Sequence, residues 1–118
     1  MDLNRDLILE SKDLPREEVE IPEWGGSVFV RTMTGEERDA FDARLYKERD
    51  KGGEEGIRNI SALVAVMTVV DRNGNRLFTE ADIVPLGRKS SGALVRIWKV
   101  AQRLNVLGPK AEEELAKN

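Results

Sequence analysis

The 118-residue sequence contains neither cysteine nor histidine. Without cysteine, it can form no disulfide, no thiolate nucleophile and no thiolate metal site. Without histidine, it lacks the side chain that most often carries protons near neutral pH and most often binds metals. Ser-His-Asp and Cys-His mechanisms are therefore excluded. No other catalytic constellation is recognisable, so we predict a protein that is not an enzyme and has no cofactor.

Long apolar runs and an excess of positive charge are also missing. The longest apolar stretch, 60–70, is well short of the roughly 20 residues needed to span a bilayer. The apolar patch Leu7–Leu9 is too short for the core of a signal peptide. The net charge of −3 gives no overall basic field for nucleic acid or an anionic membrane. We expect an intracellular protein without a membrane partner, and nucleic acid is disfavoured as a partner.

The residues that are present suit a globular protein with a charged surface, since 40% are hydrophobic and 35% are charged. The length allows one domain with one modest core. We predict a single domain over 1–118, with a polar lead-in at 1–14, a mobile glycine-rich loop at 50–56 and a charged tail at 108–118. The lead-in is compatible with a short strand, a helix or a frayed end.

Two amphipathic segments organise the predicted core, because their apolar residues recur at the i, i+3, i+4 spacing of a helix face. The first series is Ile57, Ile60, Leu63, Val64 and Met67, and the second is Leu94, Ile97, Trp98, Ala101 and Leu104. Two such faces joined by a short polar connection can pack as a helical hairpin. Ser90 or Ser91 is suited to cap the second helix.

Two further helix starts follow from capping patterns. Thr34–Glu37 matches a capping box, in which a threonine oxygen and a glutamate three residues later satisfy backbone amides, and predicts a helix over 36–48. Thr79–Asp82 matches a second cap, followed by a short helical turn that Pro85 and Gly87 should stop.

A small β-hairpin is predicted near the N-terminus. Residues 27–33 are rich in β-branched and aromatic side chains and follow a Gly-Gly turn after 19–21. Alternation places Val28 and Val30 on one face, and Phe29 and Met33 on the other. An isolated hairpin is marginal in water, so it must lie on helices or pair with another chain. The predicted fold class is therefore α+β, predominantly α-helical, with three to four helices and a small N-terminal β-hairpin.

The segment after the first core helix has two interpretations. Asn73-Gly74 is a hairpin signal, which would place strands at 67–71 and 76–79. The helical period that begins at Ile57 favours a helix to about Val69 instead, and we prefer that interpretation.

The same connection resembles a Ca²⁺ loop in outline. Oxygen-bearing side chains fall at loop positions 1, 3, 5, 9 and 12 of 71–82, as in an EF-hand. The candidate ligands include Asp71, Asn73, Asn75 and Asp82. However, glycine is at position 4 instead of 6, position 12 is the shorter aspartate, and Arg76 adds positive charge. An ordinary helix-turn-cap connection explains these residues better, so we predict no metal site.

A basic stripe on the last predicted helix has two interpretations as well. Arg96, Lys99 and Arg103 share one face, with Arg88 and Lys89 just upstream. Such a stripe can bind phosphate or an acidic partner helix. More often it is the solvated face of a helix, and we favour that interpretation.

The last helix also carries more apolar surface than one face requires. In a chain of this size, the excess indicates either a fully buried central helix or a surface that contacts another protein. The candidate contact residues are Leu94, Val95, Trp98 and Val100 on the helix, and Trp24 on a predicted turn.

The order of the segments resembles a known family. Three stretches carry the likeness: 19–37, 68–82 and 86–105. The most distinctive part is a strand, Trp-Gly-Gly, a second strand, Thr-Gly-Glu-Glu and a helix, followed later by Asp-x-x-Gly-Asn-x-Leu-Phe-Thr. Together they resemble the tail assembly chaperones of long-tailed bacteriophages and prophages, over about residues 7–107.

This resemblance implies a non-enzymatic role in the host cell cytoplasm. Members of that family coat the tape measure protein while tail tube subunits polymerise, commonly form homo-oligomers, and are absent from the finished virion. Many are also made as a longer product by a translational frameshift. The resemblance therefore implies three partners: the tape measure protein, the tail tube protein and a second copy of the chain. The alternative is a structural tail or connector adaptor that stays in the virion.

Overall fold

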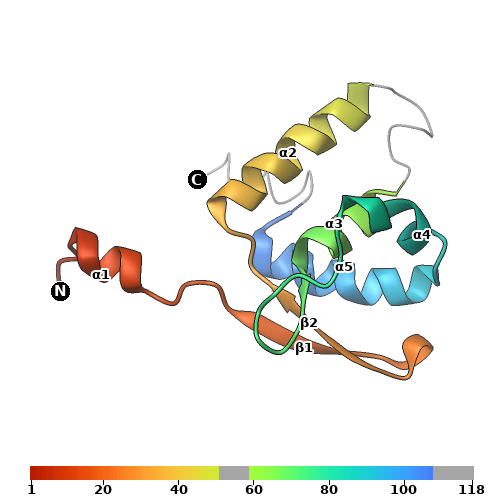
Figure 1. Ribbon diagram of the computed structural model, residues 1–118, viewed down its shortest axis with the longest axis horizontal. Helices are drawn as coiled ribbons and strands as arrows, with labels where there is room; N and C mark the ends of the chain where they lie inside the picture. The colour runs from red at the N-terminus through yellow and green to blue at the C-terminus, as the bar shows by residue number, and fades with distance from the viewer. Residues whose placement is uncertain (51–58, 108–118) are drawn as a thin grey trace.

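The computed structural model describes residues 1–50 and 59–107. The predicted mobile loop at 50–56 therefore lies outside the described residues except for Asp50, and the predicted tail at 108–118 lies outside them entirely. Figure 1 shows the arrangement of the described elements. In chain order they are α1 (Arg5–Glu10), β1 (Arg16–Ile21), the 3₁₀ turn η1 (Pro22–Trp24), β2 (Gly26–Arg31), α2 (Gly35–Asp50), α3 (Ile60–Thr68), β3 (Val69–Val70), the 3₁₀ turn η3 (Glu80–Asp82), α4 (Ile83–Gly87) and α5 (Ser91–Asn105). The α+β prediction with mostly helical structure is confirmed.

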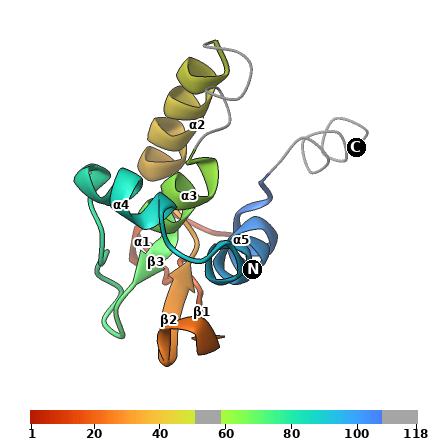
Figure 2. The same ribbon diagram turned by 90° about the vertical axis from the view of Figure 1, so that its right-hand side faces the viewer.

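Helix α3 is the centre of the core. Every residue from Ala62 to Thr68 is buried, and α2, α4 and α5 all pack against this helix (Figure 2). A helix that is apolar on all sides must be surrounded by protein. Its one buried hydroxyl is satisfied locally, because Thr68 Oγ1 donates a hydrogen bond to the carbonyl of Val64 at 2.8 Å. One interpretation of the sequence made 91–104 the fully buried central helix. In the structure that position is taken by α3.

The predicted hairpin is confirmed, and it belongs to a three-stranded antiparallel sheet of order β1-β2-β3. In the hairpin, Val19 lies opposite Val28 and Ile21 opposite Gly26. The turn includes η1 and closes at Gly25, whose φ of 74° suits a residue without a side chain. The third strand falls within the alternative strand at 67–71, and only two of its residues, Val69 and Val70, pair with β2.

The two interpretations of 67–79 are each correct in part. Helix α3 ends at Thr68, close to the preferred boundary, and the chain then becomes extended as β3. Val70 also forms an isolated bridge with Arg76 across the intervening turn. A short helix and a minimal hairpin therefore follow each other directly.

The predicted strand faces of the hairpin hold for all but one residue. Val30 is buried and Val28 packs against the core. Phe29 lies on the other face, where the guanidinium groups of Arg16 and Arg72 stand 6.0 and 5.4 Å from the ring centroid. The placement of Met33 beside Phe29 is wrong, because β2 ends at Arg31 and the alternation does not continue. Met33 is instead buried in the same core as Val30.

The predicted capping box of α2 is confirmed. The amide of Glu37 donates to Thr34 Oγ1 at 3.0 Å, and the amide of Thr34 donates to Glu37 Oε1 at 2.9 Å. Phe41 is buried on this helix, and Leu45 packs against the core one turn later. The first half of α2 is therefore held on the body.

The second predicted cap is also present. Thr79 and Asp82 form a reciprocal capping box at η3, which leads into α4. Pro85 lies inside α4 and does not end it, because it occupies the first turn, where a missing amide breaks no intrahelical bond. The helix ends at Gly87, as expected.

Helix α5 is anchored at both ends. At its start, the amide of Ala93 donates to Ser90 Oγ at 3.3 Å, so Ser90 is the cap. At its end, Asn105 is buried and its Oδ1 accepts a hydrogen bond from the amide of Met33 at 2.7 Å. The guanidinium of Arg38 also donates to the carbonyl of Asn105 at 2.6 Å. The last turn of α5 is thereby fixed to the connection between β2 and α2.

Helix α1 lies apart from this body, at the end of an N-terminal arm (Figure 1). It contains no buried residue. Among the residues that the structure describes, no helix is both long and apolar enough to cross a membrane.

Candidate interaction surface

The four α5 residues predicted to contact a partner differ in burial. Leu94 is only 6% exposed and belongs to the core. Trp98 and Val100 are partly buried and pack against that core. Val95 is 43% exposed. Of these four residues, Val95 is therefore the most exposed, and a contact role for the four residues stays a prediction.

The basic stripe of α5 is largely engaged within the molecule. Arg96 Nε lies 2.9 Å from Glu23 Oε1, and Arg103 Nη2 lies 2.6 Å from Glu17 Oε2. The pKa of Glu23 is lowered by a hydrogen bond from its own backbone amide and then by Arg96. These two ion pairs join α5 to the hairpin, and they reduce the positive charge that the stripe could offer to phosphate.

Trp24 is the fifth predicted contact residue, and it lies at the tip of the hairpin in η1. Its side chain is 36% exposed. With Phe78, Leu86 and Lys89 it lines a shallow depression of about 290 Å³. The sequence indicated Trp24 but gave no sign that it would meet α4.

A second depression, of about 140 Å³, shares three of these residues. We call the combined surface the Phe78 groove. It is lined by Trp24, Phe78, Asp82, Pro85, Leu86 and Lys89. Because a large aromatic, an aliphatic and a basic side chain meet here, the groove suits an apolar segment that carries negative charge.

The turn after β3 directs Phe78 to this position. Asp71 Oδ1 accepts hydrogen bonds from the amides of Asn73 and Asn75 at 2.8 and 3.0 Å. Arg76 Nε then donates to the carbonyl of Val66 at 3.0 Å, and the amide of Leu77 donates to the carbonyl of Val69 at 3.2 Å. These bonds return the chain to the core just before Phe78. Besides Trp24, the adjacent apolar pair Leu77-Phe78 after the turn is a sequence signal that could have indicated the groove.

The two acidic candidate Ca²⁺ ligands accept hydrogen bonds from backbone amides in two turns. The amide of Asn75, followed by that of Asn73, lowers the pKa of Asp71 by hydrogen bonding to its carboxylate. Asp82 Oδ2 accepts a hydrogen bond from the amide of Thr79 at 2.8 Å. No group of three or more acidic residues suited to hold a metal ion occurs in the described ranges. The helix-turn-cap interpretation accounts for the carboxylates of Asp71 and Asp82, whereas Asn73 and Asn75 contribute backbone amides to the first turn.

Comparison with solved structures finds the same fold in the tail assembly chaperone of bacteriophage HK97. The two structures superpose with a TM-score of 0.58 at 17% sequence identity. The match covers 87% of this chain and 94% of the other. No family model matches the sequence, and no curated protein matches it significantly. At this level of identity the likeness concerns the fold.

Proposed function

We propose that this chain, which has the fold of the HK97 tail assembly chaperone, is itself a phage tail assembly chaperone. In this role it binds the tape measure protein, assists assembly of the tail tube and catalyses no reaction. The observation that supports the proposal is the fold match, because it extends over nearly the full length of both chains. Three sequence stretches point to the same family independently.

The surface has the properties that a holding chaperone needs. A tape measure protein is long, helical and partly apolar, so it must be kept soluble until the tube closes around it. The described surface exposes several large apolar side chains within a chain that is 35% charged. Leu77 and Val84, which adjoin residues of the Phe78 groove in the sequence, are about half exposed. Exposed apolar surface of this kind marks protein contacts.

The proposal is tested by co-expression with the tape measure protein encoded in the same gene cluster. We expect the tape measure protein to become soluble and to be retained in a pull-down with this chain. A tape measure protein that stays insoluble and is not retained would contradict the role.

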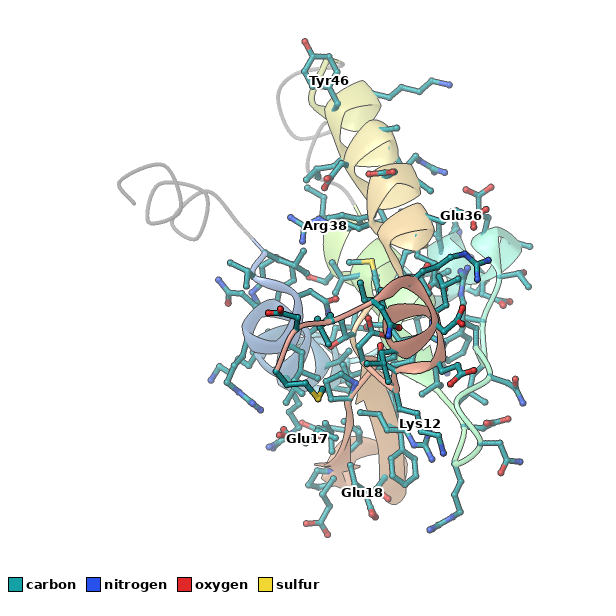
Figure 3. The ribbon with its side chains drawn as sticks, turned by 90° about the vertical axis from the view of Figure 1, so that its left-hand side faces the viewer. Lys12, Glu17, Glu18, Glu36, Arg38 and Tyr46 are labelled. Carbon is teal, nitrogen blue, oxygen red and sulfur yellow. The ribbon has the colours of Figure 1, made fainter. Side chains whose placement is uncertain are left out.

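A matched pair of variants locates the client contact. Val95→Asp places a charge at an apolar side chain that is 43% exposed on α5, whereas Tyr46→Asp does so at one that is 72% exposed on the distal part of α2 (Figure 3). We expect only the first to reduce retention of the tape measure protein. Equal retention by both variants would place the client elsewhere on the surface.

The alternative role, a structural tail or connector adaptor, differs in the fate of the chain. An assembly chaperone acts in the host cytoplasm and is absent from the finished particle. Mass spectrometry of purified virions therefore separates the two roles. Detection of this chain in stoichiometric amounts would favour the adaptor.

A further inference from the structure

In the described part of the chain, the N-terminal arm (residues 1–14) is separate from the body. Helix α1 contains no buried residue, and no other described element packs extensively against it. Leu7 is 43% exposed and Ile8 is 53% exposed, and Leu9 is more exposed than either. Figure 3 shows α1 in front of the body when the molecule is viewed from the side of the arm. The arm therefore holds a cluster of aliphatic side chains in water.

Local hydrogen bonds alone define this helix. The amide of Leu7 donates to Asn4 Oδ1 at 2.9 Å, and Ser11 Oγ donates to the carbonyl of Ile8 at 2.7 Å. Helices shorter than about 12 residues are marginal in water unless an apolar face is packed. With six residues and no packed face, α1 would be stabilised by a partner that covers its aliphatic side chains.

Every copy of the chain carries a surface of matching character in the Phe78 groove. Its two adjoining depressions, of about 290 and 140 Å³, are open to solvent, and Phe78 and Leu86 line both of them. Trp24 and Pro85 form further apolar parts of its walls. The groove thus offers apolar contacts of the size that aliphatic side chains fill.

The charges of the arm and of the groove are opposite. The arm has four acidic and two basic side chains, a net charge of −2. Lys89 lines the groove and Arg88 precedes it in the chain; both are exposed, and in the described ranges neither forms an ion pair. The one acidic residue of the groove, Asp82, already accepts a hydrogen bond from Thr79. Charge complementarity therefore favours the arm as the occupant of the groove.

The positions of the two surfaces favour contact between copies over contact within one copy. The root of the arm is fixed where the amide of Thr32 donates to the carbonyl of Pro15 at 3.0 Å. Trp24 lies at the opposite end of β1 from this root, and α4 lies on that side too (Figure 1). To reach its own groove, the arm would have to reverse direction and run back along β1.

We propose that α1 of one copy docks in the Phe78 groove of a second copy. Leu7 and Ile8 contact Trp24 and Phe78, and Asp6 and Glu10, one turn apart on α1, lie beside Arg88 and Lys89. Such an interface joins different surfaces of the two copies, so it produces rings when the rotation closes and open chains when it does not. This inference goes beyond the proposed function, which concerns the tape measure protein, and assigns the two surfaces that join one copy to the next.

Single cysteines test the contact directly, because the natural sequence contains none. A full-length Leu7→Cys chain is mixed with a Pro85→Cys chain and oxidised. We expect a disulfide-linked dimer of the two different chains on a non-reducing gel. Tyr46→Cys, at the distal part of α2, replaces Pro85→Cys as the control and should give little product. Equal yields in the two mixtures would overturn the proposal.

The location of the contact within or between copies is tested by one further variant. A chain that carries both Leu7→Cys and Pro85→Cys should form linked dimers and larger products. If it closed only on itself as a monomer, while the mixed single-cysteine chains gave no dimer, docking between copies would be excluded.

The strength of the contact is tested by sedimentation of the full-length chain. Leu7→Asp with Ile8→Asp should weaken self-association at least about tenfold, and circular dichroism should be unchanged because α1 does not pack on the body.

The charge contribution is tested by reversal. Asp6→Lys with Glu10→Lys should also weaken self-association, and Arg88→Glu with Lys89→Glu on the partner should restore the association. A wild-type monomer at all concentrations, unaltered association of the aspartate variant, or no restoration by charge reversal would each overturn the proposal.

None of these measurements involves the tape measure protein. Loss of arm docking with intact solubilisation of the tape measure protein would overturn only this inference. Intact docking without such solubilisation would overturn only the proposed function.

Discussion

Helices α3 and α1 are both rich in aliphatic residues, and their surroundings are opposite. Helix α3 has seven buried residues, and α2, α4 and α5 pack against it. Helix α1 has no buried residue and projects from the body (Figure 1). Burial of α3 lowers the free energy of the single chain, whereas the side chains of α1 can contribute in this way only in an assembly. Aliphatic content alone therefore does not distinguish a core from a docking segment.

The largest effect is expected in the core that surrounds α3. Ile97 on α5 is fully buried, so Ile97→Ala leaves a cavity and should lower the free energy of unfolding by about 2–5 kcal/mol. Urea denaturation of the purified chain measures this. Val95→Ala on the same helix is the control and should change stability by less than about 0.5 kcal/mol. Similar losses for both variants would contradict the burial that distinguishes the two faces of α5.

A smaller effect is expected where the core is held by a polar side chain. Asn105 Oδ1 accepts from the amide of Met33, and its Nδ2 donates to the carbonyl of Ala101 at 3.0 Å. Asn105→Ala leaves the buried amide without a partner and should cost about 1–3 kcal/mol. Thermal and urea unfolding measure it, with Gln102→Ala on the same helix as the control. A neutral Asn105→Ala variant would show that water replaces the side chain.

A still smaller effect is expected at the start of α2. Thr34→Ala removes the hydroxyl that accepts from the amide of Glu37, and it should destabilise the protein by about 1 kcal/mol. Thr34→Ser keeps the hydroxyl and should retain most of the stability. If serine were as destabilising as alanine, the methyl group of Thr34 and not its oxygen would be the important part.

The smallest effect on stability is expected in the arm. Leu7→Ala should change the unfolding free energy of the dilute chain by less than about 0.5 kcal/mol, because Leu7 contacts no core residue. Denaturation at several protein concentrations measures this, and a difference should emerge only where the chain associates. A loss above about 1 kcal/mol in the dilute monomer would mean that the arm packs on its own body.

Much of the fold could be predicted because the relevant signals are local. The capping boxes at Thr34 and Thr79 and the cap at Ser90 depend on residues three positions apart, and all three are present in the structure. The hairpin also follows from neighbouring residues. The third strand was only the alternative interpretation of 67–71, since two valines become a strand only when β2 lies beside them.

The candidate interaction surface was less accessible from sequence. Trp24 could be indicated because a large aromatic on a turn has little local means of burial. Its neighbours Phe78 and Leu86 lie more than 50 positions away in the sequence, and only the packing of α4 beside the hairpin tip brings them together. The isolation of α1 could not be predicted either, because a short apolar patch has the same sequence pattern whether it packs on the body or projects from it.

The two tryptophans provide a built-in pair of optical reporters. Trp24 lies partly exposed in the Phe78 groove, and Trp98 packs against the core. Emission from Trp24 should be quenched readily by iodide and shielded when a ligand covers the groove, whereas emission from Trp98 should follow unfolding. Replacing either one by phenylalanine leaves a chain whose fluorescence reports a single event, so occupancy and denaturation can be followed separately without an attached dye.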